Sequence, residues 1–142
     1  MGWSDYKRFV DMNWGNNPKN PGVYYIRCVN NSGKPIRIAR LGGVDKEGIV
    51  YIGETGRNLR NRLRNFWENA KNRRANRHRA GWNYSNLGYI KKFPLIYLEV
   101  CYMSCRDKEQ TGRVEAENLR EYRREFIDLP PLNFSAGREK YQ

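Results

Sequence analysis

A chain of 142 residues with 39% hydrophobic and 30% charged residues fits one globular domain, and excludes a disordered tail or two independent domains of ordinary size. It has no apolar run near the roughly 20 residues that span a bilayer, and its N-terminus lacks the apolar core of a signal peptide, so we expect no membrane partner and a cytoplasmic location. The formal net charge of +12 favours a polyanionic partner, nucleic acid first, over the alternative that the charge only maintains solubility.

The first half of the chain predicts a short N-terminal extension followed by a small antiparallel meander. Ser4 is placed to cap a helix over residues 5–12, and the Asn, Pro and Gly of residues 14–22 indicate a loop. β-branched and aromatic residues then predict three strands, over residues 22–29, 36–41 and 49–53. We expect these strands to pair in sequence order.

A basic helix is predicted to begin after Asn58, a favourable N-cap, because apolar residues from Leu59 to Ala70 recur at helical spacing. Between residues 57 and 79 every charged residue except Glu68 is basic. Most of these cations fall away from the apolar stripe, so we predict that they bind DNA backbone phosphates. The predicted DNA-binding residues are Arg57, Arg60, Arg64, Lys71, Arg73, Arg74 and Arg77.

Arg62 differs from these cations in its position on the predicted helix. It follows Leu59 by three residues and precedes Phe66 by four, which places it beside the apolar stripe. Burial of an unpaired guanidinium there would be costly unless an anion binds it. The alternative is that the side chain extends around Leu63 to form a salt bridge.

The second half of the chain predicts a basic connection over residues 72–84, a short helix over 85–93 and a strand over 94–103. A last helix is predicted from Asp107 to Ile127, ending before a pair of prolines. The three cysteines are too few for a disulfide framework, so we expect buried free thiols in a reducing compartment. With a single histidine we expect no zinc site.

Five motifs occur in an order that resembles the GIY-YIG nuclease family. They are GVY (22–24), YIG (51–53), NLRNRL (58–63), VEAENLREY (114–122) and PPLN (130–133). Each is weak alone, so their order and context make the case. The resemblance covers about residues 21–134 and implies an α+β fold, with a small, mainly antiparallel central sheet flanked by helices. The whole chain would be one catalytic domain, with a helical extension over about residues 1–20 and a tail over about 135–142.

The resemblance also implies hydrolysis of DNA phosphodiesters with one divalent metal ion, Mg²⁺ or Mn²⁺, and no small-molecule cofactor. By this resemblance Tyr24 is the general base, Tyr51 positions the water or the phosphate, and Arg62 stabilises charge on the phosphate. Free tyrosine titrates near pH 10, so a tyrosine base requires nearby cations that favour phenolate. Tyr25, next to Tyr24 on a strand, must point to the opposite face. The alternative is that all three are ordinary strand aromatics.

The metal ligand implied by the resemblance is a glutamate of the last helix, either Glu115 or Glu117. Glu115 precedes Leu119 by four residues and Tyr122 by seven, so it shares the inward stripe, whereas Glu117 projects nearly opposite. We therefore predict Glu115, because an inward carboxylate without a cation would be expensive and Mg²⁺ accepts one carboxylate while keeping most of its waters. The alternative is that either glutamate only pairs with an arginine of the same helix.

Two further site residues remain open. Asn133 follows two prolines, and either hydrogen-bonds a phosphate, holds Glu115, or is an ordinary turn residue. Some family members carry a histidine in the segment after the arginine, so His78 is a catalytic candidate; the alternative is a solvated residue in a basic loop.

The chain departs from the family pattern at three places. It has an extra hairpin between Tyr24 and Tyr51, Glu54 where some relatives place a lysine, and one residue inserted between Gly53 and Arg62. Its length leaves room for the catalytic unit and small additions only. We therefore expect a stand-alone restriction-type endonuclease acting on double-stranded DNA, for which a homodimer is favoured. The alternatives are a phage or mobile-element nuclease, and a non-catalytic nucleic-acid-binding module on the same scaffold.

Overall fold

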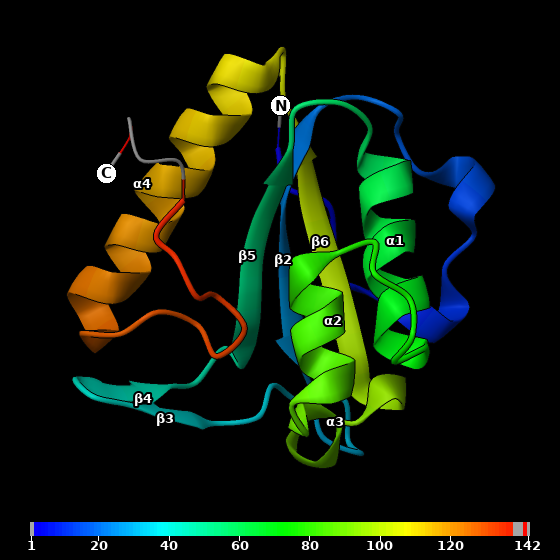
Figure 1. The fold of residues 1–142 in the computed structure, drawn as a ribbon. Coiled ribbons are helices and arrows are strands. Elements are labelled where there is room, and N and C mark those ends of the chain that lie inside the picture. The colour runs from blue at the N-terminus through cyan, green and yellow to red at the C-terminus, as the bar shows by residue number, and fades with distance from the viewer. Residues whose placement is uncertain (1, 138–140, 142) are drawn as a thin grey trace.

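A four-stranded antiparallel sheet forms the centre of the α+β fold, in the order β1-β6-β2-β5 (Figure 1). The computed structural model describes residues 2–137 and 141; residues 138–140 and 142 of the predicted C-terminal tail lie outside the described residues. The sheet strands are β1 (Lys7–Arg8), β2 (Gly22–Cys28), β5 (Ile49–Thr55) and β6 (Leu98–Ser104). The predicted fold class is confirmed.

The predicted three-strand meander is wrong, because β2 pairs directly with β5 over residues 22–27 and with β6 along its whole length. The intervening segment forms a separate hairpin of β3 (Ile38–Arg40) and β4 (Gly43–Asp45). Asp45 is 1% exposed; its carboxylate accepts hydrogen bonds from the backbone of Ile49 and from the hydroxyl of Tyr122. The hairpin lies outside the sheet because both edges of β2 are occupied by longer strands. The hydrogen bonds of Asp45 anchor it to β5 and α4.

The predicted N-terminal helix over residues 5–12 is also wrong. This segment contains β1 and a 3-10 helix, η1 (Phe9–Asp11), and a second 3-10 helix, η2 (Trp14–Asn16), follows. Ser4 does not cap a helix, because its hydroxyl accepts a hydrogen bond from the backbone of Tyr102 in β6. Phe9 is buried, and its ring stacks on Trp67 with centroids 5.2 Å apart. Sheet pairing and this burial outweigh the local helical pattern.

The helices are α1 (Leu59–Lys71), α2 (Arg79–Asn86), α3 (Tyr89–Lys92) and α4 (Lys108–Phe126), with a 3-10 helix, η3 (Leu95–Tyr97), before β6. The predictions of α1 and α4 are confirmed, with the side chains of Asn58 and Asp107 capping them. The short helix predicted over residues 85–93 is present as α3, but a further helix, α2, begins inside the predicted basic connection before it. The strand predicted from residue 94 begins only at residue 98.

The sheet separates two apolar clusters. Helices α1 and α2 cover one face, where Leu63 and Phe66 pack with Ile26 of the central strand. Helix α4 covers the other face, where Leu119 and Tyr122 pack on β5. Cys28, Cys101 and Cys105 are buried and unpaired, as predicted. Among the described residues, no helix has the length and apolar character required to cross a membrane.

Candidate active site

The register of β2 and β5 places Tyr51 on the same face of the sheet as Tyr24, because Tyr51 lies opposite Ile26, two residues after Tyr24, and a bulge follows directly. Ile26 pairs with Tyr51, but the next residue of β2, Arg27, pairs with Ile49, so Val50 is an extra residue. Such a bulge lets two consecutive side chains point the same way. Val50 and Tyr51 accordingly both pack with the cluster under α1, and the rings of Tyr24 and Tyr51 lie 6.0 Å apart. Tyr25 packs with the opposite cluster, as the alternation predicted.

Gly53 lies directly opposite Tyr24 in the β2–β5 pair. A Cβ atom there would lie 2.5 Å from Cε2 of Tyr51 and 2.6 Å from Cζ of Tyr24. No side chain other than hydrogen therefore fits between the two phenols. This packing gives the glycine of the YIG motif a physical role that the motif alone does not reveal.

His78 is 2% exposed and connects α2 to the central strand, so the alternative of a solvated loop residue is wrong. Its Nδ1 accepts hydrogen bonds from the backbone N–H groups of Ala80 and Gly81, at 3.1 and 3.3 Å, and thereby caps α2. Its Nε2 lies 2.6 Å from the hydroxyl of Tyr24. Burial, and then the charge of Arg62, hold the pKa of His78 well below its usual value.

These contacts fix the tautomer of His78. A neutral imidazole carries one proton, and a nitrogen that accepts N–H bonds cannot carry it. The proton is therefore on Nε2, which donates to the hydroxyl oxygen of Tyr24. Asn69, which is fully buried in α1, accepts hydrogen bonds from the backbone of Arg77 and His78 and holds this segment in place. Sequence reasoning missed Asn69; the available signal was its position seven residues after Arg62, beside the apolar stripe.

The structure brings Arg62 to the two phenols, as its place beside the apolar stripe suggested. Arg62 is partly buried, and its guanidinium donates to the backbone oxygen of Arg77. Burial raises the pKa of Tyr24 well above its ordinary value, and the charge of Arg62 opposes this shift. Burial, and then the charge of Glu115, raise the pKa of Tyr51 to about 12, against the opposing effects of Arg62 and of a hydrogen bond from Tyr24. Both phenols are therefore protonated at neutral pH.

A cavity of about 300 Å³ opens beside Tyr51, at the free edge of β5, and separates α2 from α4. Glu115, 8% exposed, lines this cavity, whereas Glu117 is exposed. The helical spacing thus predicted which of the two glutamates points inward. Tyr24 is fully buried behind Tyr51, so in this structure Tyr51 is the phenol that reaches the cavity.

Asn133 lines the same cavity but uses its amide group on the backbone. Its Oδ1 accepts from the N–H of Ile52 and its Nδ2 donates to the C=O of Ile52, both at 2.9 Å. The amide therefore acts as a short substitute for a neighbouring strand at the edge of β5. It holds the segment after the prolines in position to form a wall of the cavity.

A hydrated magnesium ion at the cavity would have one carboxylate ligand among the residues that line it, Glu115. Within the described residues, no three His, Cys, Asp or Glu side chains gather in one place. Glu115 provides one carboxylate, and Mg²⁺ commonly binds through one or two carboxylates and keeps several waters. A cavity of about 300 Å³ has room for such waters, each of which takes roughly 30 Å³.

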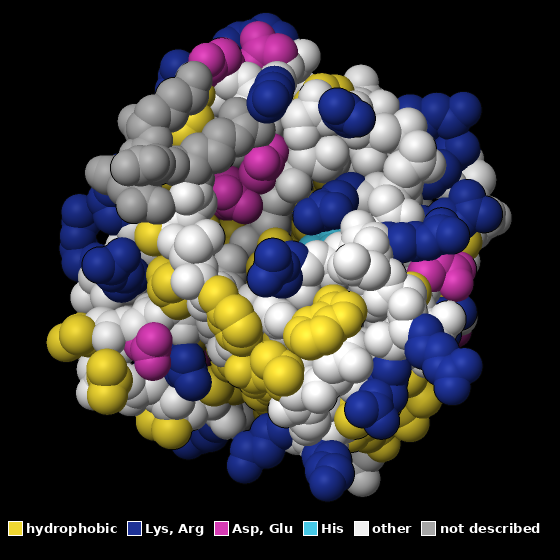
Figure 2. All heavy atoms as spheres, viewed as in Figure 1, with side chains coloured by type: hydrophobic (Ala, Val, Ile, Leu, Met, Phe, Trp, Pro, Cys, Tyr) yellow, Lys and Arg dark blue, Asp and Glu magenta, His cyan; other side chains and the backbone are white. Residues whose placement is uncertain are grey.

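The basic surface continues from the site over the exposed side of α1. Figure 2 shows dark-blue Lys and Arg side chains around a central hollow, with the cyan of the single histidine just visible at its floor. One hollow is lined by Arg57 and Arg62, and a second by Arg64, Arg74 and Arg77. The predicted DNA-binding residues Arg57, Arg64, Lys71, Arg73, Arg74 and Arg77 are exposed.

Arg60 has a structural role that the other predicted DNA-binding residues lack. It is partly buried, and its Nη2 donates to the backbone oxygens of Gly15 and Asn17, at 2.9 and 3.1 Å. These bonds attach the loop before β2 to α1. Arg60 is therefore less accessible to a DNA phosphate than Arg64, one turn further along the helix.

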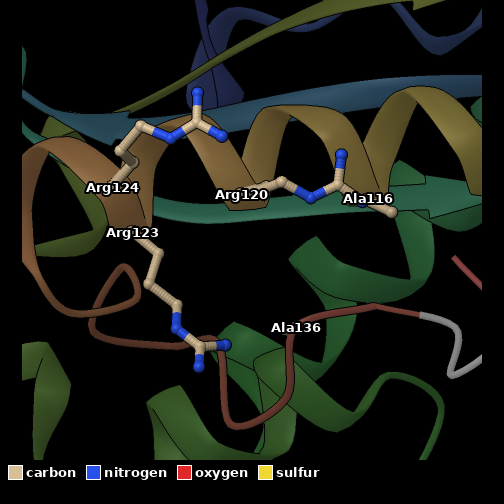
Figure 3. Close-up of a pocket in the computed structure, with 5 residues that line it drawn as sticks. All are labelled: Ala116, Arg120, Arg123, Arg124 and Ala136. Carbon is tan, nitrogen blue, oxygen red and sulfur yellow. The ribbon is translucent and has the colours of Figure 1, made fainter. Parts of the chain in front are cut away.

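A separate basic cavity, of about 510 Å³, lies on the outer side of α4. Arg120, Arg123 and Arg124 line it together with Ala136, and Figure 3 shows Arg123 extending towards the segment that carries Ala136. Ser135 and Gly137, the neighbours of Ala136, line the cavity of Tyr51 and Glu115 instead. One short segment of chain therefore forms part of both walls.

Comparisons of the chain with protein-family models, with curated protein sequences and with solved structures find no match.

Proposed function

We propose that this protein is a metal-dependent DNA endonuclease that hydrolyses phosphodiester bonds, in keeping with its resemblance to the GIY-YIG nucleases. The observation that carries the proposal is the proximity of two phenols, a guanidinium and a carboxylate: Tyr51 and Glu115 line the cavity, Tyr24 is buried, and Arg62 lines a neighbouring hollow. Tyr24 and Tyr51 each have Arg62 and Glu115 among the groups that shift their pKa. These four side chains come from four separate elements, β2, β5, α1 and α4.

The arrangement supplies the groups that phosphodiester hydrolysis requires. Arg62 can hold a phosphate oxygen and stabilise the charge that develops on it. Tyr51 faces the attacking water from the cavity wall, while Tyr24 lies behind it and is oriented by the Nε2–H of His78. In this proposal Tyr51 is therefore the general base, in place of Tyr24, for which this role was predicted from the sequence. A Tyr51 phenolate takes a proton from water, the water oxygen attacks phosphorus, and the bond to the leaving oxygen breaks.

The phenol must first lose its own proton, and this requirement sets the pH dependence. With a pKa raised to about 12, Tyr51 is mostly protonated at pH 8. Below the pKa of Tyr51 the cleavage rate is then expected to rise about tenfold per pH unit, because the phenolate fraction rises by that factor. Glu115 would hold a magnesium ion, whose positive charge favours phenolate and stabilises the leaving oxygen.

Three features beyond the cavity belong to the same proposal. The exposed arginines of α1 and of the following segment form the surface for double-stranded DNA. A restriction-type enzyme acting as a homodimer would cut both strands of a palindrome. The three free, buried thiols are compatible with a cytoplasmic location, where cysteines stay reduced.

The test is plasmid cleavage with Mg²⁺ or Mn²⁺ by the wild type and by three variants. Arg62→Ala and Glu115→Gln are expected to slow cleavage by a factor on the order of 10² or more. Glu117→Gln, a change to an exposed residue of the same helix, is the matched control and is expected to cut at the wild-type rate.

Two results would count against the proposal. If wild type leaves DNA intact with every metal and pH, but binds it in a salt-dependent way, the protein is a non-catalytic nucleic-acid-binding module. If Arg62→Ala and Glu115→Gln cut as fast as the wild type, the activity arises elsewhere in the molecule.

A further inference from the structure

The cavity beside Tyr51 contains a polar group that the proposed function leaves unused. Helix α2 contributes Arg79, Ala80 and Asn83 to the cavity, spaced so that they share one side of the helix. Asn83 is 3% exposed. In the described part of the chain, its amide nitrogen Nδ2 is buried and has no hydrogen-bond partner.

A buried donor without an acceptor is costly, so it is uncommon in folded proteins and calls for an explanation. The neighbouring polar groups are satisfied: the hydroxyl of Tyr84 donates to the backbone of Phe93, and the amide of Asn69 makes four hydrogen bonds. Orphaned amide nitrogens also occur at Asn17 and Asn118 among the described residues, but of these three only Asn83 lines the cavity of Tyr51 and Glu115.

Resting on the proposed function, we propose that Asn83 is a substrate-contacting residue, whose Nδ2 donates a hydrogen bond to an oxygen of the phosphodiester bound in this cavity. A phosphate oxygen is a strong acceptor, and a neutral amide supplies a directional donor without further positive charge. Arg79, on the same side of α2, adds the charge that favours an anion there. Substrate binding would thus supply the acceptor that the free protein lacks.

The test compares Asn83→Leu with the wild type in three measurements: thermal unfolding, affinity for duplex DNA with Ca²⁺, and cleavage with Mg²⁺. Leucine has a similar shape and removes the donor, so the melting temperature is expected to stay equal or rise, since replacing an unsatisfied polar group by an apolar one removes a cost. DNA affinity or kcat/KM is expected to fall by about tenfold to a hundredfold, the worth of one hydrogen bond to a charged group. Asn83→Asp, which places a carboxylate against the phosphate, is expected to lower DNA affinity or kcat/KM by a larger factor than Asn83→Leu does.

Asn17→Leu is the matched control, because Asn17 is 5% exposed and also has an orphaned amide nitrogen, but lies in the loop before β2. It is expected to bind and cut DNA as the wild type does. The proposal is overturned if Asn83→Leu binds and cuts DNA normally, or if its melting temperature falls along with its activity, which would indicate a structural role.

The outcomes also separate this proposal from the proposed function. A wild type that binds DNA without cutting it refutes the endonuclease, while the loss of affinity in Asn83→Leu still supports the phosphate contact. A wild type that neither binds nor cuts DNA refutes both.

Discussion

The buried, neutral state of His78 predicts a specific dependence of stability on pH. Its pKa is held well below the usual value, chiefly by burial, whereas the unfolded chain titrates near 6.5. Below that pH the unfolded state binds a proton that the folded state does not bind. The contribution of His78 to stability is therefore complete above about pH 6.5 and is lost as the pH falls.

The magnitude follows from the unfolded pKa and from a folded state that stays unprotonated. One pH unit below 6.5, proton uptake stabilises the unfolded chain by RT ln(1 + 10), or about 1.4 kcal/mol. His78 is the only histidine in the chain, so no other imidazole adds to this effect. Carboxylates contribute a separate dependence that is common to the wild type and to variants of His78.

The assay is urea unfolding at pH 8.0 and pH 5.5, for the wild type and for His78→Asn. Asparagine keeps a side-chain oxygen that can cap α2, and it does not titrate in this range. At pH 8.0 the variant is expected to be less stable by about 1–3 kcal/mol, because the buried hydroxyl of Tyr24 loses the hydrogen bond from Nε2 of His78. Between pH 8.0 and 5.5 the wild type is expected to lose about 1.4 kcal/mol more than the variant. A difference close to zero would refute the burial of a neutral imidazole.

Two further predictions concern packing around the site. Gly53→Ala places a Cβ atom 2.5 Å from Tyr51 and 2.6 Å from Tyr24, so we expect it to displace both phenols. The variant is expected to lose about 1–3 kcal/mol of stability in urea unfolding and to lose cleavage activity. Full activity together with normal unfolding would contradict this packing. Arg60→Ala removes two hydrogen bonds to the loop before β2 and is expected to lower the free energy of unfolding in urea by about 1–3 kcal/mol. The control Arg64→Ala, at an exposed position, is expected to change it by less than about 0.5 kcal/mol. Equal urea midpoints for the two variants would show that Arg60 does not hold the loop.

Local chemistry in the sequence was enough to predict α1 and α4. Each helix has a side-chain cap, and its inward stripe repeats at helical spacing, so its boundaries depend on residues close together in the chain. The same spacing separated Glu115 from Glu117 and set Arg62 apart from the exposed arginines. The strands at residues 22 and 49 were also predictable, because their composition and turns are local.

Local pattern misled where a longer-range partner was available. Residues 5–12 have a helical pattern, yet β1 pairs with β6 more than 90 residues later in the chain. The segment over residues 36–41 is strand-like, yet β2 already has β5 and β6 as neighbours. In both cases pairing across the sheet decided the outcome, and no local signal records which strands are neighbours.

The sequence by itself determined a basic α+β chain, and it placed the residues of the proposed site on predictable helices and strands. Only the tertiary structure decided how those residues meet. The bond between Tyr24 and His78 joins residues 54 apart in the chain, and the bonds between Ile52 and Asn133 join residues 81 apart. The bulge at Val50, the buried imidazole and the orphaned amide of Asn83 arise from the same packing. Such contacts depend on the balance of burial and hydrogen bonding over the whole fold, which a pattern of neighbouring residues does not contain.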